Sequence, residues 1–165
     1  GLICNIPGIT LVTFYADCVP LYFVDRKRRA VGLSHSGWRG TVNRMGQATL
    51  DAMKEAYGTC PQDVAACIGP SICKACFEVG GEVVEAFREA FPKVPSGMLW
   101  EENGKPGKYQ LDLWEANKQV LMEAGVPEAQ ITVTNICTRC NHQYLFSHRK
   151  HGEDRGNLAA FLGLR

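Results

Sequence analysis

The chain has 165 residues, which is enough for one domain with a sizeable hydrophobic core. Hydrophobic residues make up 45% and charged residues 21%, a balance that excludes a disordered chain. The net charge of +1 gives no strong field toward nucleic acid or an anionic membrane, so we expect neither as a partner. No apolar run approaches the roughly 20 residues of a membrane-spanning helix. We expect a cytoplasmic protein without a signal peptide.

Strands and helices are predicted in an irregular order. Short β-branched or aromatic runs between turn residues predict strands, at residues 10–15, 21–25, 30–34, 64–68, 98–101, 108–111 and 131–136. Apolar residues at helical spacing, followed by glycine or proline, predict helices at about residues 38–57, 81–91 and 113–124. Asp112 and Glu115 form the expected capping box of the third helix, and residues 156–164 are expected to be a short helix or strand. This mixture predicts an α+β fold of layered mixed β-sheets with packed helices, in a single domain of residues 1–165.

Eight cysteines are present, and in a chain with adequate apolar content we expect reduced thiols rather than disulfides. Cys73-x-x-Cys76 and Cys137-x-x-Cys140 have the internal spacing of a four-cysteine zinc site. However, residues 77–136 separate the two pairs, far more than the roughly 15–20 residues of zinc ribbons. The spacing therefore favours ordinary buried or half-buried thiols over a shared metal ion.

Cys18 and His35 follow or end two strands that are joined by a hairpin, whose turn carries the basic run 26–29. A meander can bring these two strand ends together, and a thiolate and a neutral imidazole are good zinc ligands. A catalytic zinc needs three protein ligands and one open position, so two residues do not complete a site. The same spacing fits a Cys18–His35 nucleophile and base pair, or simply a buried thiol and a hydrogen-bonded histidine.

Two further segments could bind an anion. Arg39 lies where the glycine-containing turn after His35 enters a helix. A helix start together with an arginine could bind an anion. Residues 146–152 combine serine, histidine and arginine in a loop that could hold a phosphate or a sugar hydroxyl. A surface arginine with a carboxylate partner, or an exposed polar loop, would explain the same residues.

Taken together, these segments resemble the YfiH-like family. The resemblance rests on residues 16–20 (ADCVP), 35–40 (HSGWRG), 68–72 (IGPSI) continuing to 76–80 (CFEVG), and 137–140 (CTRC) running on to 146–150 (FSHRK). The family has been labelled laccase-like or multicopper polyphenol oxidase and is now regarded as purine nucleoside phosphorylases. Lys150 stands where the family usually has arginine, which weakens an anion role at that position.

The resemblance implies the layered CNF/YfiH-like fold, related in its core to bacterial cysteine deamidase toxins, and a zinc ion held by two histidines and one cysteine. Cys18 matches the cysteine and His35 the second histidine. The first histidine of the family would lie upstream of Gly1. We therefore expect residues 1–165 to be the C-terminal two-thirds of a YfiH-like domain, with an incomplete metal site.

The activity implied is phosphorolysis of adenosine, inosine and methylthioadenosine to a free base and ribose 1-phosphate, with zinc-dependent adenosine deamination as a possible companion. Asp17, beside the metal ligand, is a candidate proton shuttle. Arg39 and Arg149 are the candidate anion-binding residues, so purine nucleosides and phosphate are the expected partners.

Three rival functions remain open. A laccase would need several copper ions and far more histidines than the four present. A cysteine hydrolase or deamidase would use Cys18 and His35 as a dyad and would survive zinc removal. A non-catalytic binding module would turn over no purine nucleoside.

Overall fold

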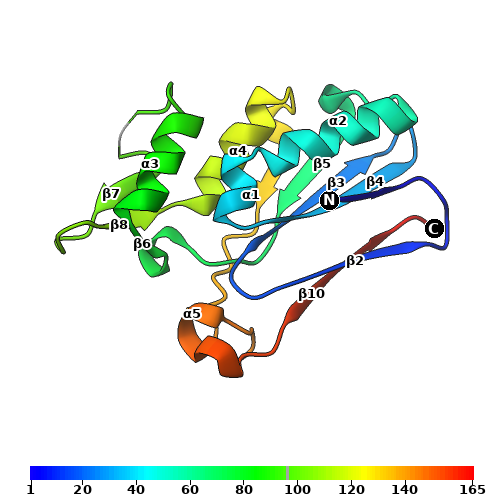
Figure 1. The fold of residues 1–165 in the computed structure, drawn as a ribbon. Helices are drawn as coiled ribbons and strands as arrows, with labels where there is room; N and C mark the ends of the chain where they lie inside the picture. Colours follow the sequence, from blue (N-terminus) through cyan, green and yellow to red (C-terminus); the bar gives the residue numbers. More distant parts are fainter. Residues whose placement is uncertain (96) are drawn as a thin grey trace.

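The central feature of the computed structural model, which describes residues 1–95 and 97–165, is a five-stranded mixed sheet (Figure 1). Its strand order is β1 (Leu2–Cys4), β4 (Ala30–Ser36), β3 (Val19–Asp25), β5 (Val64–Ile68) and β9 (Ile131–Val133). The first four strands pair antiparallel, whereas β5 and β9 are parallel neighbours. This parallel pair brings the segments after β5 and β9 to the same edge of the sheet, although they are far apart in the chain.

Helices cover one face of this sheet: α1 (Trp38–Val42), α2 (Met45–Tyr57) and α4 (Leu113–Glu123) (Figure 1). Successive side chains of β3 point alternately to the two faces of the sheet. Its residues Val19, Leu21 and Phe23 are fully buried in the main core, which also contains Leu50 and Leu121 from the helices.

A two-stranded antiparallel ribbon of β2 (Thr10–Tyr15) and β10 (Leu158–Gly163) covers the opposite face. A smaller apolar cluster lies beneath it, with Leu11 and Tyr15 from β2, Leu33 from β4 and Ala160 from β10. Cys18 packs against this cluster. The sheet is therefore buried on both faces at the end that carries Cys18.

The remaining elements extend the fold beyond the central sheet. A second, three-stranded antiparallel sheet contains β6 (Glu78–Gly80), β8 (Lys108–Leu111) and β7 (Trp100–Glu102). Helix α3 (Gly81–Ala90) follows β6, and the short α5 (His148–His151) precedes β10. The described part of the chain also contains four 3-10 helices: η1 (Pro61–Asp63), η2 (Lys74–Cys76), η3 (Glu128–Gln130) and η4 (Gly152–Asp154). Every helix in the described ranges is too short or too polar to cross a lipid bilayer.

The predicted α+β class with layered mixed sheets is confirmed, and three details are corrected. The predicted helix at residues 38–57 is two helices, because Arg44 adopts a left-handed φ of 55° between them. Strand β9 stops at Val133 rather than at residue 136. The tail, expected to be a short helix or strand, is strand β10 and needs no correction. Asp112 caps α4 by accepting from the Glu115 N–H at 3.0 Å, whereas the Glu115 carboxylate accepts from Gln119 instead of completing the box. Strands β1 and β6 and helix α5 were not predicted.

A buried polar network fixes the end of β4 beside His35. The Ser36 hydroxyl donates to Asn117 Oδ1 at 2.8 Å, and Asn117 Nδ2 donates to Thr41 Oγ1 at 3.0 Å and to the Leu113 carbonyl at 2.8 Å. All three polar side chains are buried, at 1% exposure or less. Buried polar groups stabilise a fold only when each has a partner. The network thus joins the end of β4 to both α1 and α4.

We expect Asn117→Ala to lower the free energy of unfolding by about 1–3 kcal/mol, because it removes the buried partner of the Ser36 hydroxyl. Urea denaturation followed by circular dichroism measures this change. The matched control is Asn157→Ala, at an exposed position, where the expected change is within about 0.5 kcal/mol. Equal stability of the two variants would contradict the structural role of the network.

Candidate metal and substrate site

Cys18 and His35 lie at adjoining ends of the antiparallel pair β3–β4. The register places Val19 opposite Ser36 and Pro20 opposite His35. Directly opposite residues of an antiparallel pair share a face, so Pro20 and His35 point to the side covered by the β2–β10 ribbon. Cys18 packs against the apolar cluster on that same side. The thiol and the imidazole therefore belong to one face of the sheet.

Gly37 leaves room beside the Cys18 thiol. A Cβ atom at position 37 would lie 2.8 Å from Cys18 Sγ, closer than real Cβ atoms approach. Any side chain at position 37 would thus push the thiol out of place. The glycine of the His-Ser-Gly-Trp segment has a steric reason to be there.

The His35 ring is suited to coordinate a metal without first losing a proton. It lies edge-on to the Tyr15 ring, with centroids 6.1 Å apart and planes at 80°. Loss of water around part of the ring lowers the pKa of His35 below its ordinary value, although the side chain remains exposed. The neutral imidazole is the form that binds zinc.

The pKa of the Cys18 thiol is shifted in the direction opposite to that of an activated nucleophile. Burial, reinforced by the negative charge of Asp17, raises the pKa of the Cys18 thiol, and Arg155 offsets this only in part. Catalytic cysteines have lowered pKa values. These properties favour a metal ligand, which a bound cation deprotonates, over a cysteine–histidine dyad.

The two donors fit a zinc ion in kind, but they supply two of the three ligands that a catalytic zinc needs. Across residues 1–95 and 97–165, the one group of three or more histidine, cysteine or acidic side chains close enough to share an ion is formed by other cysteines.

Asp17 is held by contacts on both carboxylate oxygens. The Thr138 hydroxyl donates to Oδ1 at 2.6 Å, and the Arg149 backbone N–H donates to Oδ2 at 2.7 Å. The residue is 8% exposed, and its own carbonyl accepts from the Ile72 N–H at 3.0 Å. Both oxygens are thus occupied by fixed donors. These contacts favour a positioning role for Asp17 over the expected role of proton shuttle.

A pocket of about 120 Å³ opens beside Cys18. Its walls come from the turn before β3, from the starts of α1, α4 and α5, and from the segment after β5: Ala16, Asp17, Cys18, Trp38, Ile72, Phe77, Leu113, His148 and Arg149. Of the five predicted site residues, the pocket brings together Asp17, Cys18 and Arg149. His35 and Arg39 lie outside this lining.

The two candidate anion-binding arginines differ in their surroundings. The Arg149 guanidinium lies over the Phe77 ring at 5.2 Å and donates from Nη1 to the Glu78 carbonyl at 2.7 Å. A guanidinium has five N–H donors, so this contact orients the group and leaves donors for a ligand. Arg39 is exposed and stacks on the Trp38 ring, with its Cζ 4.2 Å from the ring centroid.

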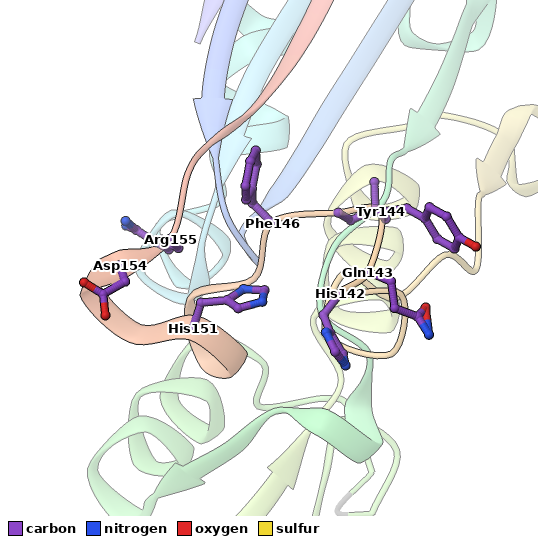
Figure 2. A pocket seen from close by; sticks show the side chains of 8 residues that line it. His142, Gln143, Tyr144, Phe146, His151, Asp154 and Arg155 are labelled. Atoms are coloured by element: carbon purple, nitrogen blue, oxygen red, sulfur yellow. The ribbon is translucent and has the colours of Figure 1, made fainter.

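The C-terminal loop predicted at residues 146–152 contains helix α5 instead. Ser147 caps this helix by accepting a hydrogen bond from the Lys150 N–H, and the Asp17 carboxylate accepts one from the Arg149 N–H. The helix start is therefore already occupied by protein acceptors. A separate cavity of about 220 Å³ is lined by other residues of this segment, among them His142 and His151 (Figure 2). The rings of these two histidines lie 5.7 Å apart, and the cavity shares no lining residue with the pocket beside Cys18.

The wall residues Ile72 and Phe77, and Thr138, which donates to Asp17, were not singled out by sequence reasoning. Each lies within a segment that carried the family resemblance, at residues 68–72, 76–80 and 137–140. The available signal was therefore the motif, and the missing information was which of its residues face Cys18 and Asp17.

The inference drawn from the spacing of the cysteine pairs is corrected by the structure. Cys73, Cys76, Cys137 and Cys140 lie together, as free cysteines, close enough to hold one metal ion. Their sequence separation does not keep them apart, because β5 and β9 are parallel neighbours that end at the same edge.

Comparison with known proteins identifies the family. The family model described as "Multi-copper polyphenol oxidoreductase laccase" matches residues 1–165, and the chain belongs to this family. It is 43% identical to a purine nucleoside phosphorylase of Bacteroides thetaiotaomicron, over 96% of this chain and 58% of that protein. It is 42% identical to an adenosine deaminase from an unknown prokaryotic organism, over 99% of this chain and 61% of that protein.

The crystal structure of hypothetical protein YfiH from Bacillus licheniformis shares the fold. It superposes with a TM-score of 0.90 at 35% identity, covering 99% of this chain and 60% of that one. The predicted YfiH-like membership and fold are thereby confirmed. The chain spans about three-fifths of the length of the relatives it matches.

We expect Thr138→Val to lower the free energy of unfolding by about 1.5–3 kcal/mol, because it removes a hydrogen bond to the buried Asp17 carboxylate. Thermal and urea denaturation measure the change. Thr132→Val, on an exposed position of the edge strand β9, introduces the same substitution without touching a carboxylate and should be nearly neutral. A neutral Thr138→Val would show that the contact does not stabilise the fold.

Proposed function

We propose that the full-length protein carrying this sequence is a purine nucleoside phosphorylase that acts on adenosine, inosine or methylthioadenosine, with Cys18 and His35 as two zinc ligands. The observation that carries the proposal is the position of these two side chains on one face of the β3–β4 strand ends, with the Cys18 pocket and Arg149 beside them. The phosphorylase name of the Bacteroides relative supports the reaction type.

The reaction itself needs an anion site and a position for the sugar. A phosphate oxygen attacks C1′ of the ribose, the bond from C1′ to the base breaks, and the base leaves with the electron pair and takes up a proton. When bound, zinc supplies Lewis-acid polarisation and a water molecule of lowered pKa. The third protein ligand is proposed to be a histidine outside residues 1–165.

Arg149 is proposed to bind the phosphate, and Arg39 to assist from the rim. Arg149 is held by Phe77 and by the Glu78 carbonyl, so little side-chain freedom is lost when it binds an anion. Arg39 adjoins Trp38, which is part of the pocket wall. An apolar wall with one fixed cation is suited to a flat base next to an anionic group.

Asp17 is proposed to act on the reaction through its neighbours. Its carboxylate holds the Arg149 backbone through the N–H and the 137–140 turn through Thr138, so it sets where Arg149 and Cys18 lie. A direct proton transfer by Asp17 would require it to give up one of these two contacts.

The size of the pocket limits the proposal. Ligand pockets usually measure roughly 300–1,000 Å³, whereas the cavity beside Cys18 measures about 120 Å³. The cavity would hold only part of a nucleoside. The remaining wall is proposed to come from residues outside this sequence or from a second copy of the chain.

Adenosine deamination is the second candidate, because one relative is named adenosine deaminase. This reaction would convert adenosine and water to inosine and ammonia without consuming phosphate. A cysteine hydrolase is the less favoured alternative, because burial raises rather than lowers the pKa of Cys18.

The first test is turnover by the full-length protein with adenosine and phosphate, followed by chromatography for adenine, inosine, hypoxanthine and ribose 1-phosphate. We expect Cys18→Ala to lose both the zinc of this site and turnover, because the thiolate is a metal ligand. Cys60→Ala, at an exposed cysteine away from the site, should retain both.

Three results would contradict the assignment. Turnover retained in Cys18→Ala would remove Cys18 from the site. Activity that survives zinc removal but is lost after iodoacetamide treatment would favour a cysteine hydrolase. Absence of turnover with every purine nucleoside would leave a binding module.

The second test is Arg149→Lys, which keeps the charge but loses the planar group. We expect the KM for phosphate to rise roughly 10–100-fold, the equivalent of one charge-assisted hydrogen bond of about 1.5–3 kcal/mol. The KM for the nucleoside should change much less. The control is Arg88→Lys, whose guanidinium pairs with Glu85 on the surface of α3. An unchanged KM for phosphate would exclude Arg149 from the anion site.

A further inference from the structure

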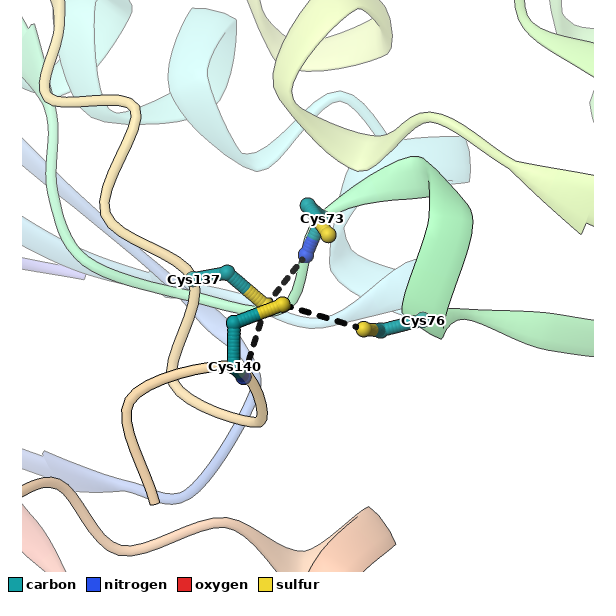
Figure 3. A group of neighbouring side chains, drawn as sticks. All are labelled: Cys73, Cys76, Cys137 and Cys140. Carbon is teal, nitrogen blue, oxygen red and sulfur yellow. Dashed lines mark hydrogen bonds between the residues drawn. The ribbon is translucent and has the colours of Figure 1, made fainter. Parts of the chain in front are cut away.

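Four cysteine side chains converge between two loops outside the Cys18 site (Figure 3). Cys73 and Cys76 lie on the segment after β5 that contains η2, and Cys137 and Cys140 lie on the turn after β9. All four Sγ atoms lie within 4.8 Å of one another, and those of Cys76 and Cys140 are 3.5 Å apart. The four sulfur atoms form a compact cluster with no other ligand type.

These separations match those of a tetrahedral four-thiolate site. A zinc–sulfur bond of about 2.3 Å gives a sulfur–sulfur edge of about 3.8 Å in a regular tetrahedron, because the edge is about 1.63 times the centre-to-corner distance. Shifts of a few tenths of an ångström to about 1 Å, within the freedom of four cysteine rotamers, would bring every pair to this value.

A pair of disulfides accounts for the cluster less well. A disulfide needs sulfur atoms about 2.05 Å apart, and it joins cysteines two by two, leaving no reason for all four to meet at one point. All four are free cysteines in this structure.

Hydrogen-bond donors already point at the sulfur atoms. The Cys140 and Cys73 backbone N–H groups both donate to Cys137 Sγ at 3.4 Å, and Arg139 Nη1 donates to Cys76 Sγ at 3.4 Å. Donors aimed at sulfur stabilise the negatively charged thiolate that a metal ion requires. A cluster of neutral thiols packed only for its apolar character would not need them.

The fold explains why the two pairs meet. Strands β5 and β9 run side by side in parallel, with Ile68 opposite Val133, and an isolated parallel bridge continues the pairing from Ser71 to Cys137. The two Cys-x-x-Cys turns therefore follow neighbouring strand ends at the same edge of the sheet. Two such turns facing each other supply four ligands in a closed arrangement, which is characteristic of structural zinc.

We propose that Cys73, Cys76, Cys137 and Cys140 bind one structural zinc ion that fastens the loop after β5 to the loop after β9. These loops carry Ile72, Phe77 and Thr138, which form or support the wall of the Cys18 pocket. The ion closes a long stretch of chain, so it stabilises the native loops at the expense of unfolded states. The proposal does not depend on the reaction assigned to the Cys18 site.

The test uses the full-length protein carrying this sequence, purified under reducing conditions, with zinc measured by inductively coupled plasma mass spectrometry. We expect Cys76→Ser and Cys140→Ser each to lose close to one equivalent of zinc relative to the parent protein. Cys60→Ser, at an exposed cysteine outside the cluster, should lose none. Cys18→Ala should lose turnover and keep the zinc of the cluster, so failure of the proposed function and failure of this proposal give different results.

A second measurement covers the case in which the serine variants do not fold. Cobalt(II) replaces zinc in the unsubstituted protein, and the sulfur-to-cobalt charge-transfer absorption grows with the number of thiolate ligands. We expect the intensity of a four-thiolate centre and a lower melting temperature after treatment with a strong chelator.

Several outcomes would overturn the proposal. These are cluster cysteines recovered as disulfides from protein prepared without air, cobalt absorption no stronger than that of one thiolate, and zinc content unchanged in both serine variants. Iron in place of zinc, recognised by visible absorption of the protein as isolated, would overturn the assignment of the metal.

Discussion

The buried Asp17 carboxylate is the contact on which the arrangement of the pocket depends. A carboxylate removed from water is costly unless donors surround it, and here Thr138 and the Arg149 N–H occupy its two oxygens. Asp17 also adopts a left-handed φ of 78°, a conformation that aspartate tolerates better than most residues. This turns the chain between β2 and β3 so that the Asp17 carbonyl accepts from Ile72 and Cys18 directly precedes β3. One residue thereby holds three distant segments around the thiol.

The sequence was most informative where structure is local. The β3–β4 hairpin could be predicted because its apolar runs flank a polar turn, in which Asp25 Oδ1 accepts from the Lys27 and Arg28 N–H groups. A short hairpin fixes its own register, so the prediction that Cys18 and His35 come to adjoining strand ends required no long-range information. The Asp112 cap of α4 was equally readable, because an N-cap bond spans only three residues.

Long-range pairing could not be predicted from the sequence in the same way. The partners of Asp17, at positions 138 and 149, and the meeting of the cysteine pairs both depend on β5 lying parallel to β9, across more than 60 residues of chain. Spacing rules for zinc ribbons assume that both turns belong to one short local unit. That assumption fails here, because a parallel pair needs a long crossover connection. The break at Arg44 was also hidden, since the apolar spacing continues across it.

The two candidate metal centres have different supports and therefore different consequences for the molecule. The Cys18–His35 face belongs to the hairpin, whose end is fixed by Ser36, Asn117 and Thr41 from within the main core. The four-cysteine cluster lies between two loops at the boundary of the main core, with Cys137 buried in that core at 5% exposure and Cys140 exposed. Core packing and hydrogen bonds stabilise the first arrangement, whereas the proposed ion would add a link between two loops that the Ser71–Cys137 bridge already brings together. Thr138 lies between Cys137 and Cys140 and donates to Asp17. A fixed position of the cluster therefore also fixes the hydrogen-bond donor of the carboxylate that holds the pocket.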